Sequence, residues 1–487
     1  MLFNSFNFLI FFPIVTLAYF LIPQRLKYLW LLLASYYFYM SWNPKYALLI
    51  LASTAITFLS GILIDRAKSK KSKKWAVFGS FALNLFILFF FKYFYFTVDN
   101  INAVRSILKL PAYVPRFDIV LPVGISFYTF QALSYTADVY RGEVKPEKNF
   151  LKYALFVSFF PQLVAGPIER SKNLLSQVNA EHHFDYLRVR KGLVTMLWGF
   201  FLKLVIADRA AILVNTVYDN ISAFTGAQIA LATICFAVQI YCDFASYSTI
   251  AIGAAEVMDF NLMQNFKRPY FAASITDFWR RWHISLSSWF RDYLYISLGG
   301  NKKGALRKYL NIMIVFLTSG LWHGASWHFV IWGAIHGVYQ IIGGVTKKAR
   351  QNLRERLLIK DGNLLYVFLS RAVTFVLVCF SWIFFRSADM GEAAEAVKRI
   401  FTSFNPSELK ITDLGIDVAN IIVLLSAVLV LIAVSIFQER DENMLKKAEN
   451  MHFIARWAVY LVLIFAVLIF GVYGPGFEAS QFIYFQF

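Results

Sequence analysis

Three histidines stand in an otherwise apolar stretch of the sequence. His323, His328 and His336 lie within residues 318–337, among tryptophan, glycine and aliphatic side chains. Ionisable side chains at membrane depth are costly and usually serve a function. Because burial disfavours a charged imidazole, such a histidine stays neutral and suits a general base that takes a proton from an alcohol. The stretch therefore predicts one catalytic base.

The spacing of the histidines indicates which of them fills that role. His336 follows His323 by 13 residues, about 220° of rotation at 3.6 residues per turn, so one straight helix would point them nearly opposite ways. Gly320 and Gly324 flank His323 and permit a helix break and a close backbone approach there. We therefore favour His323 for catalysis and expect His336 to be structural.

A further histidine, His283, lies in residues 265–308, where charged and aromatic side chains are interleaved. No lipid-facing span carries that density of charge, so the segment predicts an interfacial or re-entrant helix. From the residues alone, His283 fits an active site and a structural hydrogen bond equally well. His182, His183 and His452 are read as solvated, and no acidic or cysteine ligands accompany any histidine at zinc-like spacing, so we expect no metal.

Other polar side chains recur in apolar segments. Each of them alone is typical of a hydrogen bond between helices. Together they predict a polar tunnel, and its candidate residues are Gln131, Gln162, Gln239 and Asp243.

The composition shows which elements must position these residues. Hydrophobic residues make up 59% of the 487 positions and charged residues 16%, well below the roughly 25% charge of soluble domains. The net charge of +19 is carried by loops between apolar segments, which indicates the positive-inside bias and not a nucleic-acid partner. We expect one all-α membrane domain over residues 1–487, with lipid as its main solvent.

A span needs about 20 apolar residues, and the sequence offers roughly eleven candidates. Segments 119–135 and 150–168 are apolar but broken by proline and glycine, and are read as re-entrant. The candidate spans are 6–23, 28–42, 46–64, 75–97, 192–207, 226–241, 309–322, 326–343, 364–385, 417–437 and 453–473.

Two basic runs, residues 66–74 and 347–360, set the expected topology. Both should be cytoplasmic. Counting spans outward from them places the N-terminus, the C-terminal Phe-Ile-Tyr-Phe-Gln-Phe and the acidic loop 387–416 outside the cell.

Two motifs resemble a known family. Phe278-Trp-Arg-Arg-Trp-His283-Ile-Ser-Leu-Ser-Ser-Trp-Phe-Arg-Asp-Tyr293, followed after 40 residues by the histidine of Gly-Leu-Trp-His323-Gly, looks like the signature of membrane-bound O-acyltransferases. Residues 160–170, residues 239–247 and the opening Leu2-Phe-Asn-Ser are similar to the bacterial alginate O-acetyltransferase branch. The resemblance covers most of the chain and is sharpest across 119–345.

The resemblance implies a ring of helices around a thin centre, in a multi-pass protein of the bacterial cell membrane. It implies that His323 is catalytic and that His283 is a second active-site residue. It also implies that acetyl groups pass from cytoplasmic acetyl-CoA, a substrate and not a bound cofactor, to an extracytoplasmic partner. That partner resembles SGNH hydrolases, and a polysaccharide is the final acceptor.

In the mechanism expected from these residues, basic side chains attract the phosphates of coenzyme A. His323 deprotonates the hydroxyl that attacks the thioester, while His283 orients the acyl group or donates a hydrogen bond to the developing oxyanion. A transient acyl-histidine is an open variant. The candidate coenzyme A residues are Arg268, Arg280, Arg281, Lys302 and Lys303.

Two rival functions remain open from the sequence. A D-alanyl transferase acting on teichoic acid from a carrier-protein donor would use the same histidines. A transporter would use the polar tunnel, but the sequence shows no clear pair of matched broken-helix repeats.

Overall fold

The computed structural model describes residues 1–112, 119–360, 362–441, 451–473 and 482–483, and every element within them is a helix. The chain divides into two compact units. Unit 1 comprises residues 1–196 and 250–263, and unit 2 comprises residues 197–249 and 264–483. The prediction of one domain over 1–487 stays a prediction.

Unit 1 holds helices that pack through small and hydroxyl side chains. A Cβ atom on Gly61 of α3 would lie 2.7 Å from the Tyr135 hydroxyl of α6, and the Tyr153 hydroxyl of α7 donates to Thr57 Oγ1 at 2.8 Å. These contacts let the helices approach closely, as in other membrane bundles. The helices that begin in this unit are α1 (Phe6–Leu21), α2 (Gln24–Met40), α3 (Ala47–Arg66), α4 (Lys70–Leu88), α5 (Phe94–Ile107), α6 (Ile125–Arg141), α7 (Phe150–Ser158), α8 (Ser171–Val178) and α9 (Tyr186–Phe200).

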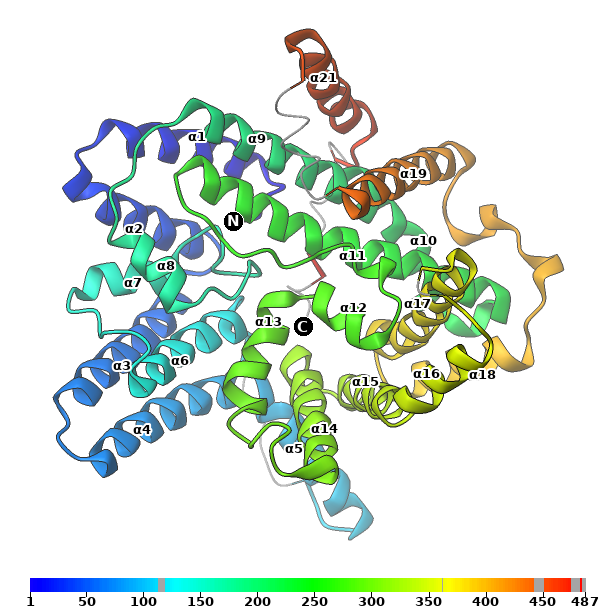
Figure 1. Cartoon of the computed structure of the whole chain (residues 1–487), viewed down its shortest axis with the longest axis horizontal. Helices are drawn as coiled ribbons and strands as arrows, with labels where there is room; N and C mark the ends of the chain where they lie inside the picture. The colour runs from blue at the N-terminus through cyan, green and yellow to red at the C-terminus, as the bar shows by residue number, and fades with distance from the viewer. Residues whose placement is uncertain (113–118, 361, 442–450, 474–481, 484–487) are drawn as a thin grey trace. The chain divides into compact units, whose positions relative to one another are not determined.

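Unit 2 contains the histidine-rich stretch, as an antiparallel pair of helices that lie side by side, α14 and α15 (Figure 1). Short elements α12 and α13 precede this pair, and a π-helical turn, Phe290–Tyr295, follows α13. The main helices here are α10 (Asp208–Tyr218), α11 (Gly226–Val257, which runs on into unit 1), α12 (Ile275–Arg281), α13 (Ile284–Trp289), α14 (Gly304–His323), α15 (Trp327–Val345), α16 (Lys347–Arg356), α17 (Leu364–Arg386), α18 (Met390–Thr402), α19 (Val418–Arg440) and α21 (Phe453–Phe470).

Many of these helices have apolar surfaces that suit contact with lipid, and the chain is a multi-pass membrane protein. Among the described residues, six helices are long and apolar enough to cross a membrane, or up to seven if α15 and α16, bent by 50°, count as one span. The predicted number of about eleven is not confirmed. The six are Pro44–Arg66, Lys70–Ile107, Gly226–Val257, Leu364–Arg386, Val418–Arg440 and Phe453–Phe470.

Three predicted segments take shapes that the sequence reading did not specify. Residues 387–416 are not a plain loop, because they contain α18 and two 3-10 turns. In the segment read as re-entrant, α7 ends at Ser158 and a buried non-helical stretch follows it. Most of the C-terminal hexapeptide falls outside the described residues, which include only Phe482 and Ile483 of it.

Candidate active site

His323 is the last residue of α14, so the predicted helix break occurs at this histidine. The chain leaves the helix at Gly324 and enters α15 at Trp327. A Cβ atom on Gly320 would lie 2.3 Å from the Phe329 carbonyl oxygen, and one on Gly324 would lie 2.1 Å from the Phe329 ring. Only glycine permits this tight reversal, which fixes the position of the His323 backbone.

Aromatic rings enclose the His323 side chain, which is 4% exposed. Its ring centroid lies 5.0 Å from that of Trp322, 5.0 Å from Trp332 and 5.4 Å from Phe385. The C-terminal end of a helix carries a partial negative charge, which favours positive charge nearby. His323 therefore combines a surrounding of aromatic rings with a position at the C-terminal end of α14, where the helix dipole favours positive charge.

His283 is fully buried and its ring centroid lies 6.4 Å from that of His323. It occupies the break between α12 and α13, in the left-handed backbone region with φ of 44°, which is uncommon for a residue other than glycine and concentrates at functional sites. Rings of Phe244 and Trp322 pack on it at 4.6 and 5.9 Å. The structure thus brings together two histidines that are 40 residues apart in the sequence.

Asn265 holds the backbone turn at His283, and the sequence reading missed it. Its backbone oxygen accepts from Ile284 N at 2.9 Å, and its Oδ1 lies 3.1 Å from His283 Nδ1. Ser285 contributes two more donors to Oδ1, its N at 3.3 Å and its Oγ at 2.9 Å. Burial lowers the pKa of the His283 imidazole to about 3, so this side chain is neutral at physiological pH. No spacing rule singles out Asn265, because its contacts depend on the turn.

His336 is satisfied on both ring nitrogens, as expected for a structural histidine. Trp279 Nε1, which can only donate, bonds to His336 Nδ1 at 3.2 Å. The proton of His336 is therefore on Nε2, which donates to Ser381 Oγ at 2.9 Å, and Ser381 donates in turn to the Val378 carbonyl at 2.7 Å. This network ties α12, α15 and α17 together. His328 is likewise bonded, through Nδ1 to the Phe384 carbonyl at 3.0 Å.

Replacing His336 with alanine is expected to lower the stability of the protein more than its chemistry. The change leaves the buried Trp279 N–H without a hydrogen-bond acceptor, which lowers the free energy of unfolding by about 1–3 kcal/mol. The apparent melting temperature in detergent should fall, while activity per folded molecule stays within about tenfold of wild type, a bound well below the loss expected for a general base. His183→Ala, at an exposed position, is the control. A variant that melts like wild type but has no activity would contradict this assignment.

His182 corrects a prediction, because it is buried and not solvated. Its ring stacks on Phe260 with centroids 4.3 Å apart, and its Nε2 lies 2.8 Å from the Gln177 carbonyl oxygen. Burial lowers its pKa. The neighbouring polar residues of its loop misled the sequence reading, whereas His183 and His452 are exposed as predicted.

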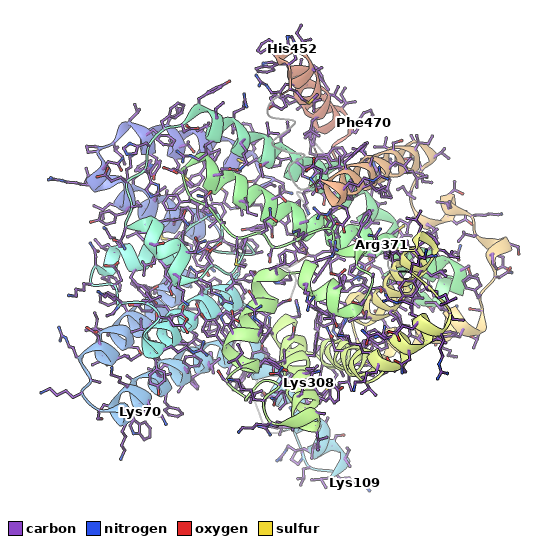
Figure 2. All side chains as sticks on the ribbon, in the orientation of Figure 1. Lys70, Lys109, Lys308, Arg371, His452 and Phe470 are labelled. Carbon is purple, nitrogen blue, oxygen red and sulfur yellow. The ribbon has the colours of Figure 1, made fainter. Side chains whose placement is uncertain are left out.

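The five candidate coenzyme A residues fall into two groups. Arg268 Nε lies 2.6 Å from Glu439 Oε2, and Arg281 bonds to the same carboxylate at 3.0 Å, so both are engaged in an ion-pair cluster. Arg371 of α17, labelled in Figure 2, lies 4.0 Å from Glu439 and belongs to that cluster. The remaining three, Arg280, Lys302 and Lys303, are exposed.

The four predicted tunnel residues are buried, in two pairs that belong to different units. In unit 1, Gln162 Nε2 donates to Gln131 Oε1 at 3.0 Å. In unit 2, Asp243 is paired with Lys203 at 2.6 Å, and Gln239 lies one turn earlier on α11. Gln131, Gln162 and Asp243 thus bond to other segments of their own unit, and a shared tunnel stays a prediction.

Comparison with known proteins places this site in a family. Residues 142–380 match the model of the membrane-bound O-acyltransferase family. The chain is 38% identical to the probable alginate O-acetylase of Pseudomonas putida, over 87% of this chain and 85% of the relative. It is 33% identical to the peptidoglycan O-acetyltransferase of Helicobacter pylori, over 82% and 79%. A teichoic acid D-alanyltransferase of Bacillus subtilis is 27% identical over 56% and 70%.

The family match covers both α12 to α15 and the two histidines that these elements bring together. Identity at this level over most of both chains, with the buried histidine pair in place, shows that the chain is an O-acyltransferase of the membrane-bound O-acyltransferase family.

Proposed function

We propose that this enzyme moves acetyl groups from cytoplasmic acetyl-CoA across the membrane for O-acetylation of an extracytoplasmic polysaccharide. The observation that carries the proposal is the pair of buried histidines, His283 and His323, with ring centroids 6.4 Å apart. Relatives named as acetylases of alginate and of peptidoglycan support acetyl as the group and a glycan as the destination.

His323 is the general base in this proposal. Its imidazole takes the proton of a hydroxyl while the hydroxyl oxygen bonds to the thioester carbon. The carbon–sulfur bond then breaks, and the imidazolium returns the proton to the departing thiolate of coenzyme A. The products are an acetyl ester and a free thiol, and the neutral imidazole is restored. The helix end at His323 favours the imidazolium between these two steps.

The exposed cations Arg280, Lys302 and Lys303 are the best placed of the candidates to attract the coenzyme A phosphates. Arg268 and Arg281 already pair with Glu439, so we assign them to holding α12 and the segment before it against α19 within unit 2. This division narrows the set predicted from the sequence to three residues.

The acceptor side rests on the relatives and on the charge pattern. We expect both termini and residues 387–416 to face the outside of the cell, because the basic runs 66–74 and 347–360 favour the cytoplasm. We propose that an SGNH-hydrolase-like transferase receives the acetyl group on that side and delivers it to the polysaccharide. The helix α18 within residues 387–416 is a candidate contact for that partner.

D-alanyl transfer to teichoic acid from a carrier protein is the second candidate. It is favoured by the similarity to the Bacillus subtilis enzyme, but that similarity covers 56% of this chain against 87% for the alginate relative. The family membership favours an enzyme over the transporter considered from the sequence.

The proposal is tested with purified protein in nanodiscs and acetyl-CoA labelled on the acetyl group. Free thiol release is followed with and without a candidate extracytoplasmic partner, and the label is traced to the partner or to added polysaccharide. We expect thiol release that depends on the acceptor and label on a hydroxyl. Release from a D-alanyl carrier protein but not from acetyl-CoA would overturn the acetyl proposal and favour the second candidate.

A further inference from the structure

Asn265 determines which nitrogen of His283 carries the proton. The Ser285 backbone N–H, which can only donate, points to Asn265 Oδ1 at 3.3 Å. On the other side of the amide, Asn265 Nδ2 donates to Ser248 Oγ at 3.1 Å. The Ser285 contact fixes the orientation of the amide, because a flipped side chain would set its NH₂ group against the Ser285 N–H, and the Ser248 hydroxyl is compatible with that orientation.

An amide oxygen has no proton to give, so the contact of 3.1 Å between Asn265 Oδ1 and His283 Nδ1 requires a proton on Nδ1. A neutral imidazole has one N–H group. Its other nitrogen, Nε2, is then a lone-pair acceptor. Burial, which lowers the pKa of His283 to about 3, keeps the ring in this neutral form.

The surroundings of the ring reinforce this arrangement. Phe244 and Ser248 lie one turn apart on α11. The Phe244 ring contacts the His283 ring, with centroids 4.6 Å apart, and Ser248 accepts a hydrogen bond from Asn265, which in turn holds His283. Asn265 also binds the Ile284 N–H with its backbone oxygen at 2.9 Å, which sustains the left-handed turn at His283. The ring is thus set by α11 and by the turn at once.

We infer that Asn265 is a positioning residue that locks His283 in the Nδ1–H tautomer, so that His283 meets the substrates of acyl transfer as a hydrogen-bond acceptor. This inference rests on the proposed function for its catalytic meaning. The inference differs from the oxyanion donor that the sequence suggested for His283. A neutral imidazole has one N–H group, and because that group donates its hydrogen bond to Asn265, no N–H group remains to stabilise an oxyanion. Its substrate partners are O–H or N–H groups, such as the amide N–H groups of the pantetheine arm.

The tautomer is measured directly by ¹⁵N NMR on the full chain in nanodiscs, labelled on histidine. The seven histidines are distinguished by comparison with His283→Gln. We expect a neutral His283 with its proton on Nδ1. A proton on Nε2, or an imidazolium at neutral pH, would overturn the inference. This readout needs no acyl donor, so it stands apart from a failure of acetyl-CoA to serve as substrate.

The functional test compares two replacements of similar size. Asn265→Asp keeps an oxygen acceptor for Nδ1, whereas Asn265→Leu removes it. We expect kcat/KM for acetyl transfer to fall by roughly 10- to 100-fold in Asn265→Leu, as for other residues that orient a histidine, and to stay within about tenfold of wild type in Asn265→Asp. Asn311→Leu, which removes a buried amide of α14 bonded to the Gly300 carbonyl, controls for loss of stability alone.

Equal losses in both Asn265 variants would show a merely structural role and overturn the inference, as would wild-type transfer in Asn265→Leu. If Asn265→Leu does not fold, Ser248→Ala takes its place. That change frees the amide while leaving Oδ1 in the chain, and it should lower kcat/KM by a few-fold. An unchanged rate together with a changed tautomer in Ser248→Ala would also count against the inference.

Discussion

Replacing His323 with alanine is expected to lower acetyl transfer by roughly 10²- to 10⁴-fold, the range that a general base contributes. The imidazole is enclosed by Trp322, Trp332 and Phe385, so no bulk water replaces it as a proton acceptor. Free thiol release from acetyl-CoA in nanodiscs measures the loss. The affinity for acetyl-CoA should change little, because the phosphates are expected to bind exposed cations and not this buried ring.

The controls for this result separate chemistry from folding. His323→Gln fills a similar volume without a basic nitrogen and should be as inactive as His323→Ala while melting closer to wild type. His183→Ala removes an exposed histidine and should transfer at the wild-type rate. Full transfer by His323→Gln would exclude His323 as the base, and the histidine of this family motif would then have a role other than proton transfer in this chain.

The second large effect is expected from a single added methyl group between α14 and α15. A Cβ atom on Gly333 would lie 2.3 Å from the Phe316 carbonyl oxygen, so Gly333→Ala must push the two helices apart. Overpacking of this kind costs typically 1–3 kcal/mol. Because His323 ends α14, we also expect transfer per folded molecule to fall about 100-fold, as for other misplacements of about 1 Å.

The matched control lies on the same helix. Gly343 of α15 has open space around its Cβ position, and alanine there should raise stability by about 0.5–1 kcal/mol through a better helix propensity. Apparent melting temperatures and thiol release are measured for both variants side by side. If Gly333→Ala and Gly343→Ala behaved alike, the close packing of α14 on α15 would not control the site.

The sequence predicted those parts of the site that depend on local pattern. Gly320 and Gly324 marked the helix break at His323, and the resemblance of two motifs led to the pairing of His283 with His323. The sequence did not reveal the role of Asn265, because this role depends on the turn at His283 with its positive φ, and no periodicity in the sequence predicts such a turn. The pairing of Arg268 and Arg281 with Glu439 was hidden for a similar reason, since the carboxylate comes from α19, over 150 residues later in the chain.

The fold was predictable as an all-helical membrane protein but not in its number of spans. Hydropathy identifies apolar segments, yet α14 and α15 carry histidines and glycines where they contact protein, so composition alone cannot say which helices cross. The burial of His182 was also not predictable from its neighbours in the sequence. Its polar neighbours in the sequence suggested water, whereas the folded chain surrounds it with Phe260 and backbone carbonyls.

The contacts between α14 and α15 also bear on which sequences this fold can use. At Gly320 and Gly333 the space for a side chain is already filled by a backbone carbonyl of the facing helix, and at Gly337 by Met313. A saturation library over α14 and α15 should therefore lose nearly all substitutions at Gly320 and Gly333 and accept many at Gly343. The tolerated substitutions would lie on the face of α15 that does not contact α14. Sequence variation is then confined to positions that leave the distance between the two helices unchanged.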